Sequence, residues 1–246
     1  MSKFAVILAA AGKSSRFKDE HYKKPFAVLN RKAVWLHSAD IFLKRDDVKQ
    51  VIVVIAEDDR ENFMAKFGAN LAVLGIDVVL GGKERSDSVQ NALKKVDDSI
   101  GFVAVHDAAR PCVSDEEIEN VFAMARTSNA AILATPVANT LKKSAPDKSI
   151  AGTVDRSGLW NALTPQVFEK QLLLDAYSKL GEQRATDDAQ VVELTGQNVS
   201  LVEGSPLNIK ITTKRDLNLA AACMAAKPKP KLNSPAHPFA DDNLWQ

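Results

Sequence analysis

Short apolar runs alternate with amphipathic segments over the first half of the chain, and this alternation restricts the possible folds more than any other feature. The apolar runs lack a polar face, which is typical of strands buried on both sides of a sheet. These expected strands are Phe4–Ala10, Val51–Ile55, Ile76–Leu80, Phe102–Val105 and Ala130–Ala134. The segments with helical spacing are Ala33–Leu43, Arg60–Phe67, Ser86–Val96 and Ser114–Ala125, and a capping box of Ser114 and Glu117 opens the last of them. Because strand–helix–strand connections are right-handed and join parallel strands, the sequence predicts an open α/β sandwich with a mostly parallel central sheet.

The pattern changes at Pro136. From Val137 to Gly158 the chain is polar and tolerates β-structure, and Pro146 and Gly152 interrupt it. We interpret this stretch as a hairpin-like arm inserted into the α/β domain. Beyond it the sequence predicts helices at Glu169–Leu180, Asp187–Leu194 and Lys214–Ala226, and a strand at Val199–Val202.

The end of the chain differs in composition from the rest. Residues 227–246 open with Lys-Pro-Lys-Pro-Lys and contain four of the ten prolines. A segment of this kind cannot pack a core, so we expect a loosely ordered extension. The expected organisation is one α/β domain over residues 1–226, with the arm at 137–158, followed by a tail at 227–246.

Composition excludes several classes of function. Lys and Arg number 32 and Asp and Glu 31, so the net charge of +1 gives no general positive field for nucleic acid or a membrane surface. The two cysteines, Cys112 and Cys223, are too few for a disulfide framework or a zinc site of four cysteines. The apolar run Phe4–Ala11 is too short to span a membrane, and the charged loop after it does not fit a signal peptide. We therefore expect a cytoplasmic protein.

The first strand runs directly into a loop of small and basic residues within Leu8–Phe17. This loop is neither a P-loop, because Ile7 stands where the first glycine belongs, nor a dinucleotide fingerprint, because Ser14 replaces its second glycine. It does lie at the carboxyl end of a strand, where open α/β sheets bind ligands. Its small residues allow a base or ribose to approach the backbone, and Lys13 and Arg16 are suited to phosphates. The alternative is an ordinary turn with solvated charges.

Two further loops add to this inventory. Lys24 is followed by Pro25 and is suited to a phosphate, although such a pair also occurs in solvated turns. Gly81 and Gly82 precede a helix and leave backbone N–H donors open to a ligand, with Ser88 available for a base edge. The alternative for this second loop is a plain connection in which Ser86 caps the helix.

The fourth loop, His106–Pro111, follows the Phe102–Val105 strand directly. Asp107 at the end of that strand is a natural magnesium ligand, and Arg110 would be costly to bury without an anion. We expect His106 to be a hydrogen-bonding support rather than a base, and a structural, turn-capping role for Asp107 is the alternative. Together the four loops offer small residues, cations and one carboxylate at one edge of the sheet. That set suits a nucleotide with magnesium and supplies no nucleophilic side chain.

These motifs resemble the 2-C-methyl-D-erythritol 4-phosphate cytidylyltransferase family over roughly residues 3–226. The resemblance covers the opening loop, Lys24, Gly81-Gly82 with Ser88, His106–Pro111, Thr140, Thr153–Arg156, Leu159–Gln166, Thr186–Asp188 and Asn208–Thr212. It implies a Rossmann-like nucleotidyltransferase fold, a homodimer joined through the inserted arm, and dependence on Mg²⁺ or another divalent cation. The implied reaction transfers CMP from CTP to 2-C-methyl-D-erythritol 4-phosphate, which gives 4-diphosphocytidyl-2-C-methyl-D-erythritol and pyrophosphate in the non-mevalonate isoprenoid pathway.

The resemblance also implies a role for each matching residue. The cytidine would be held by Ala10, Ala11, Gly12, Gly82 and Ser88; the triphosphate by Arg16 and Lys24; and the metal by Asp107. The methylerythritol phosphate pocket would consist of Thr140, Arg156, Thr164, Thr186 and Lys210, with Arg110 nearby. We expect Arg16, Lys24, Arg156 and Lys210 to act on the reacting phosphates.

The chain departs from the family pattern at two places. Ser14 replaces the second glycine of the opening loop, and Lys23-Lys24-Pro25-Phe26 replaces the usual Pro-Lys-Gln-Tyr, so Lys23 is the alternative to Lys24. Two other functions are weighed against the main one. They are a ribitol-5-phosphate cytidylyltransferase with the same fold, and a nucleotide sensor that binds CTP without turning it over.

Overall fold

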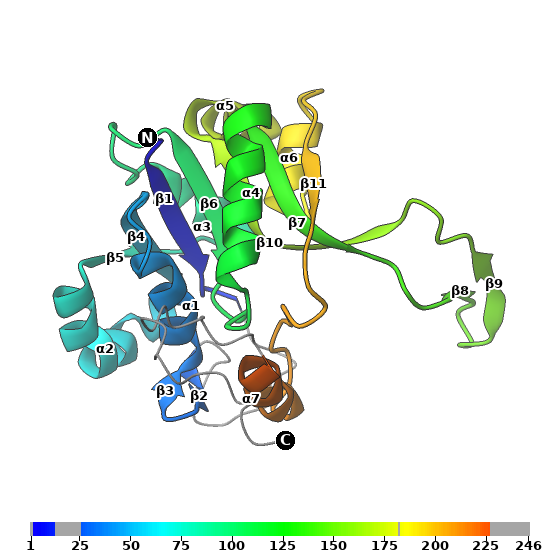
Figure 1. Ribbon diagram of the computed structural model, residues 1–246, viewed down its shortest axis with the longest axis horizontal. Helices are drawn as coiled ribbons and strands as arrows, with labels where there is room; N and C mark the ends of the chain where they lie inside the picture. Colours follow the sequence, from blue (N-terminus) through cyan, green and yellow to red (C-terminus); the bar gives the residue numbers. More distant parts are fainter. Residues whose placement is uncertain (1, 13–25, 182, 227–246) are drawn as a thin grey trace, which may run out of the picture.

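The structure is a computed structural model and describes residues 2–12, 26–181 and 183–226. In this part of the chain a sheet of seven strands has the order β11-β7-β10-β6-β1-β4-β5 (Figure 1). The strands are β1 (Phe4–Ala9), β4 (Val48–Ile55), β5 (Ile76–Leu80), β6 (Phe102–Asp107), β7 (Ala130–Pro136), β10 (Trp160–Glu169) and β11 (Ser200–Glu203). All pairs are parallel except those that β10 makes with β6 and β7, so the expectation of a mostly parallel sheet is confirmed.

β1 is the strand at which the direction of the chain's path through the sheet reverses. From β1 the chain moves outward through β4 to β5, and then returns to place β6 on the other side of β1. Ala9 at the end of β1 is in register with Val54 of β4 and with Asp107 of β6. Ligands of open α/β sheets bind in the crevice at such a switch point, outside the carboxyl ends of the strands.

Helices cover both faces of the sheet, as the alternation of segments predicted. One face carries α1 (Val34–Leu43), α2 (Arg60–Leu74) and α4 (Asp115–Ser128). The other carries α3 (Arg85–Leu93), α5 (Lys170–Leu180) and α6 (Asp188–Glu193). Side chains alternate between these two cores along β1, where Val6 faces the first and Ile7 the second, because successive residues of a strand point to opposite faces.

The sequence predicted capping residues for two helices, α4 and α3, and one of the two predictions is confirmed. The Ser114 hydroxyl accepts a hydrogen bond from the Glu117 N–H at 3.2 Å, and the Glu117 carboxylate accepts from the Ser114 N–H at 2.8 Å, so the predicted capping box is confirmed. Ser86, the alternative cap of the helix after Gly82, is not a cap. That helix begins one residue earlier, with Glu84 as its N-cap and Asp87 completing a capping box.

β10 is the main element that the sequence did not predict. Its first three residues are exposed and only the later ones are buried, so it has no continuous apolar run. Pro165 also lies inside it, and proline normally argues against a strand in the middle of a sheet.

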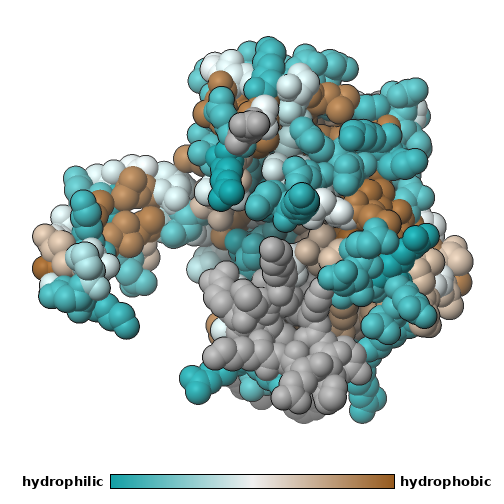
Figure 2. Space-filling model, turned by 180° about the vertical axis from the view of Figure 1, so that it is seen from behind, coloured by the Kyte–Doolittle hydropathy of each residue, from teal (hydrophilic) through white to brown (hydrophobic). Residues whose placement is uncertain are grey.

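The segment expected to form an arm contains β8 (Leu141–Ser144) and β9 (Ile150–Val154), which pair antiparallel. Figure 1 shows this hairpin at the end of two extended connections that project away from the sheet. Apolar side chains gather on the arm among polar ones in Figure 2, and those exposed on it and at its base include Ile150, Val154 and Trp160.

The remaining elements lie beyond the carboxyl ends of the central strands. They are β2 (Val28–Leu29), β3 (Lys32–Ala33), a 3-10 turn η2 (Glu57–Asp59) and α7 (Arg215–Ala226). α7 packs on β2 through a small core of its own that includes Leu29, Cys112 and Cys223, and both cysteines are unbridged. None of the described helices is long and apolar enough to cross a membrane. The tail expected at 227–246 lies outside the described residues.

Candidate active site

A cleft of about 290 Å³ opens at the carboxyl ends of β1 and β6, at the switch point of the sheet. Three of the four loops singled out in the sequence meet there. The cleft is lined by Ala9, Ala10, Ala11, Gly12, Gly82, Lys83, Glu84, Arg85, Ser88, Asp107, Ala109 and Lys210. The cations expected on the remaining positions, Arg16 and Lys24, lie outside the described residues.

The paired glycines are required because two loops approach each other closely. A Cβ atom on Gly81 would lie 2.7 Å from the Ala11 Cβ, and one on Gly82 would lie 2.3 Å from the Asp87 Cβ. The Ser88 hydroxyl closes this loop: it accepts from the Gly82 N–H at 3.1 Å and donates to the Glu84 carbonyl at 3.0 Å. One acceptor position on the Ser88 oxygen remains, so its expected contact with a base edge stays a prediction.

Asp107 is the last residue of β6, and its carboxylate forms ion pairs with two basic side chains. Lys210 Nζ lies 2.7 Å from Asp107 Oδ2, and Arg110 Nε lies 3.3 Å from the same oxygen. Burial opposes ionisation of this carboxyl, but the charges of Lys210, Arg85 and Arg110 outweigh it and hold the Asp107 pKa well below its usual range. The carboxylate is therefore ionised throughout the physiological pH range.

His106 precedes Asp107 and is linked to it through hydrogen bonds that both residues make with Thr164. Its Nε2 lies 3.1 Å from the Arg110 carbonyl, which can only accept, so Nε2 carries the proton and Nδ1 accepts from the Thr164 hydroxyl at 3.1 Å. The same Thr164 oxygen accepts from the Asp107 N–H at 3.1 Å. Burial lowers the His106 pKa to about 4, so the ring is neutral at pH 7. The structure thus gives His106 the supporting position expected of it, with both nitrogens engaged.

Asn208 also belongs to this network, and the sequence pattern around it gives no signal of that role. Its carbonyl accepts from Arg110 at 2.8 Å, and its side-chain amide donates to the Thr164 carbonyl at 3.0 Å. These bonds fasten the chain two residues before Lys210 to the end of β6 and the middle of β10. The segment Asn208–Thr212 therefore delivers Lys210 to the cleft.

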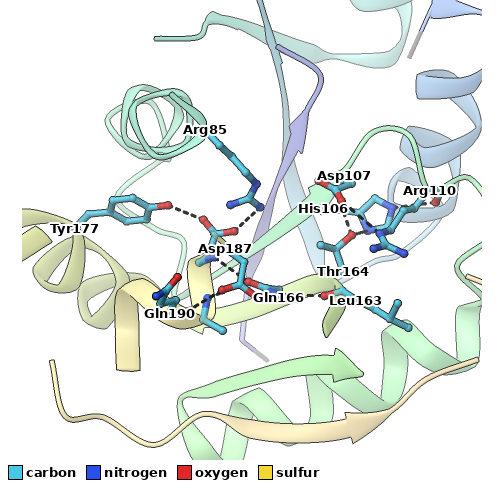
Figure 3. A network of polar contacts seen from close by, with 12 residues as sticks. Arg85, His106, Asp107, Arg110, Leu163, Thr164, Gln166, Tyr177, Asp187 and Gln190 are labelled. Atoms are coloured by element: carbon cyan, nitrogen blue, oxygen red, sulfur yellow. Dashed lines mark hydrogen bonds and ion pairs between the residues drawn. The ribbon is translucent and has the colours of Figure 1, made fainter. Parts of the chain in front are cut away.

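A second network, which sequence reasoning missed, centres on the buried Asp188. Figure 3 labels its partners Arg85, Gln166 and Tyr177. Arg85 lies 2.6 Å from one Asp188 carboxylate oxygen, and the Tyr177 hydroxyl donates to the other at 2.6 Å. The Gln166 side chain accepts from the backbone N–H groups of Asp188 and Ala189, each at 3.0 Å. Arg85 and Asp188 are 103 residues apart, so no local pattern could have paired them.

Comparison with known protein families identifies the family of this chain. The model of IspD, 2-C-methyl-D-erythritol 4-phosphate cytidylyltransferase, matches residues 4–226. The chain belongs to this family.

Curated and solved members of the family agree over nearly the whole chain. The 2-C-methyl-D-erythritol 4-phosphate cytidylyltransferase of Rhodopirellula baltica is 41% identical in an alignment of 231 residues, and the match covers 89% of this chain and 94% of that protein. The protein of the same name from Clostridioides difficile is 34% identical and covers 94% of this chain and 98% of its own. The crystal structure of the Francisella tularensis cytidylyltransferase superposes with a TM-score of 0.75 at 30% identity, and covers 90% of this chain and all of that one.

Four of the residues that the family resemblance assigns to the second substrate do not line the cleft of a single chain. Thr140 and Arg156 lie on the projecting arm and are exposed (Figure 1). Thr186 is exposed, and its hydroxyl donates to the Gln190 side chain at 3.1 Å. Thr164 is buried beneath Asp107. Of that group, only Lys210 reaches the cleft directly, with Arg110 beside it.

The family resemblance implies a divalent cation, and one carboxylate of the cleft suits it. No group of three or more metal-binding side chains occurs among the described residues. However, Mg²⁺ in nucleotide enzymes is usually bound by one or two carboxylates together with substrate phosphates. Asp107, an ionised carboxylate that lines the cleft at a rigid strand end, fits that pattern.

Proposed function

We propose that this chain transfers CMP from CTP to 2-C-methyl-D-erythritol 4-phosphate and releases pyrophosphate. The observation that supports this most is one cleft that joins a wall of small residues to a cluster of cations. The small residues are Ala10, Ala11, Gly12 and Gly82, and the cations are Lys210 and Arg110 around Asp107. A nucleotide fits the first part, and a second phosphate fits the other.

The nucleotide would lie against the small-residue wall. Gly81 approaches Ala11 so closely that a Cβ on it would lie 2.7 Å from the Ala11 Cβ, which leaves little width for a base beside Gly82. A single pyrimidine ring fits such a slot better than a purine. Arg16 and Lys24 are proposed to bind the triphosphate, with Lys23 as the alternative to Lys24.

The acceptor phosphate would meet Lys210, with Arg110 nearby. A phosphomonoester has a second pKa of about 6, so it is mostly dianionic at pH 7 and needs no general base. This agrees with a neutral His106 whose two nitrogens are already engaged. The phosphate oxygen attacks the α-phosphorus of CTP, and the bond to pyrophosphate breaks. The chain's contribution is to align two polyanions and to stabilise the charge that develops between them.

We propose that Asp107 holds the divalent cation, most simply Mg²⁺, together with the triphosphate. The ion would supply charge neutralisation on the phosphate oxygens. Lys210, which pairs with Asp107 in the structure, would then be available to the acceptor phosphate.

We further propose a cytoplasmic homodimer in which the arm completes the partner's site. Thr140 and Arg156 are exposed on an arm that also exposes apolar side chains, including Ile150 and Val154. Burying these apolar side chains against a partner would be favourable. In a two-fold dimer each subunit's arm would then lie over the cleft of the other subunit.

The test is release of pyrophosphate from CTP with Mg²⁺, with 2-C-methyl-D-erythritol 4-phosphate and ribitol 5-phosphate as acceptors. We expect turnover with the first and little with the second. Preferential use of ribitol 5-phosphate would replace the proposed acceptor. Binding of CTP without pyrophosphate release from any acceptor would identify a sensor.

A further inference from the structure

Arg85 and Asp188 have no role in the reaction proposed above, yet they form an ion pair at the edge of the cleft, in which Asp188 is buried and Arg85 partly buried. Arg85 is the first residue of α3 and lines the cleft beside Gly82. The Asp188 side chain is fully buried and lines no part of the cleft. The pair therefore connects the nucleotide loop to a group that is out of reach of any substrate.

Asp188 is fixed from three directions. The Tyr177 hydroxyl of α5 donates to Asp188 Oδ1 at 2.6 Å, and the Gln166 side chain of β10 accepts from the Asp188 N–H at 3.0 Å. The third contact is Arg85 itself, at 2.6 Å (Figure 3). Burial and the nearby Asp188 charge raise the Tyr177 pKa, so the hydroxyl keeps the proton that it donates.

Stability alone is a poor explanation for such a pair. Removing charges from water is costly, and a buried ion pair often stabilises a fold no better than apolar residues of similar size. What such a pair does supply is an anchor, because the carboxylate bonds one nitrogen of the guanidinium and limits the orientation of the arginine side chain. Here that orientation is imposed at the start of α3, next to Gly82 and three residues before Ser88.

Arg85 also acts on the other side of the cleft. Burial raises the pKa of Asp107, and the positive charges of Lys210 and Arg85 lower it. A guanidinium displaced by loss of Asp188 would therefore disturb both the nucleotide loop and the charge balance around Asp107.

We propose that Asp188 is a positioning residue for the nucleotide, which fixes Arg85 and thereby holds the Gly82–Ser88 loop in the conformation that binds CTP. This rests on the proposed function, since CTP is the ligand assigned to that loop. Asp188 acts only through Arg85 and does not contact a substrate.

The experiment measures the Kd of CTP with Mg²⁺ by calorimetry, together with kcat and the melting temperature, for Asp188→Asn and Tyr177→Phe. We expect Asp188→Asn to weaken CTP binding about 10-fold or more, within the ~5–150-fold range typical of coupling between sites. Tyr177→Phe keeps the ring volume and should weaken binding less. In an Arg85→Gln background, Asp188→Asn should cause no further loss, because the effect passes through Arg85.

The matched control is Asp47→Asn. Asp47 is also a largely buried carboxylate with two arginine partners, Arg45 at 3.0 Å and Arg126 at 2.5 Å. It precedes β4 and so lies at the opposite edge of the sheet from the cleft. Both aspartate variants should lower the melting temperature, but only Asp188→Asn should change the Kd of CTP.

The outcomes separate the two proposals. If the wild-type protein does not bind CTP, the proposed function and this inference both fall. If the wild type binds CTP and Asp188→Asn binds it equally well despite a lower melting temperature, the positioning role is wrong and the proposed function stands. Should Asp188→Asn not fold, an unchanged Kd in Tyr177→Phe together with an unchanged Kd in Arg85→Gln would also overturn the inference.

Discussion

At the scale of single residues, Asp107 is the carboxylate on which the cations of the cleft converge. Lys210 lies 2.7 Å from it and Arg110 3.3 Å, and Asp107 is itself fixed by the Thr164 hydroxyl. The position of Asp107 after a buried strand could be predicted from the sequence. Its partner Lys210 was found only through the family resemblance, because the two residues meet through folding and not through any local pattern.

The proposed role of Asp107 as a metal ligand predicts the effect of Asp107→Asn. The amide keeps the shape of the side chain but loses the negative charge, so the Mg²⁺ concentration for half-maximal activity should rise about 10-fold or more, since full charge is what favours binding of a hard cation. The measurement is a magnesium titration of pyrophosphate release. Asp98→Asn, on a fully exposed side chain, is the control. An unchanged titration in Asp107→Asn would assign Asp107 to positioning Lys210 and Arg110 instead.

The close approach at Gly82 predicts the effect of Gly82→Ala. The added Cβ would lie 2.3 Å from the Asp87 Cβ, so the loop must shift, and the KM for CTP should rise about 10-fold, equivalent to ~1.4 kcal/mol of lost binding. Steady-state kinetics at varied CTP measure this. Gly68→Ala in α2 is a matched control, because its Cβ meets nothing within 4 Å. Equal KM values for Gly82→Ala and the wild type would place the nucleotide away from this loop.

At the scale of elements, helix ends were predictable where a side chain caps the backbone locally. The Ser114–Glu117 box depends on residues three positions apart, so the sequence contains all of it. β10 was not predictable in the same way, because its pairing with β6 and β7 overrides an exposed start and the internal Pro165. The second helix start was placed one residue too late, since Glu84 rather than a serine is its cap.

The capping box predicts a measurable contribution to folding. Ser114→Ala removes the acceptor for the Glu117 N–H and should lower the free energy of unfolding by about 1 kcal/mol. Urea denaturation should show this as a lower midpoint with an unchanged slope. Ser178→Ala, at an exposed position within α5, should change stability by less than about 0.5 kcal/mol. Equal midpoints for the two variants would mean that another group replaces the Ser114 hydroxyl.

At the scale of the whole molecule, the arm is the feature that one chain cannot explain. It leaves the sheet after β7 and returns as β10, and it carries Thr140 and Arg156 away from the cleft (Figure 1). The sequence predicted a hairpin here from its polar, β-tolerant composition. Binding of the arm to a second subunit depends on contacts between chains, and the hydrophobic pattern of a single sequence does not encode which surfaces meet.

Mixed dimers test the shared site. Asp107→Ala and Arg156→Ala proteins should each be nearly inactive. If each site takes Asp107 from one chain and Arg156 from the other, a mixed dimer has one site with both lesions and one with neither. Random reassortment makes half of the dimers mixed, so co-refolding should restore about a quarter of the wild-type activity. Mass spectrometry verifies that mixed dimers form. If they form and no activity returns, Arg156 acts within its own chain.

The long separation between paired residues also sets the order in which this molecule can mature. Arg85 joins Asp188 across 103 residues, and Asp107 joins Lys210 across the same number. Closing loops of this length costs entropy that only a nearly complete fold repays, which makes such contacts late events in folding. After dilution from denaturant, the Trp35 environment, which is formed by α1 and α2 nearby in the chain, should recover before CTP binding does. A nascent chain would thus have most of its sheet and yet bind nucleotide only weakly until the segment carrying Asp188 had emerged, and it would lack the acceptor site until Lys210 followed.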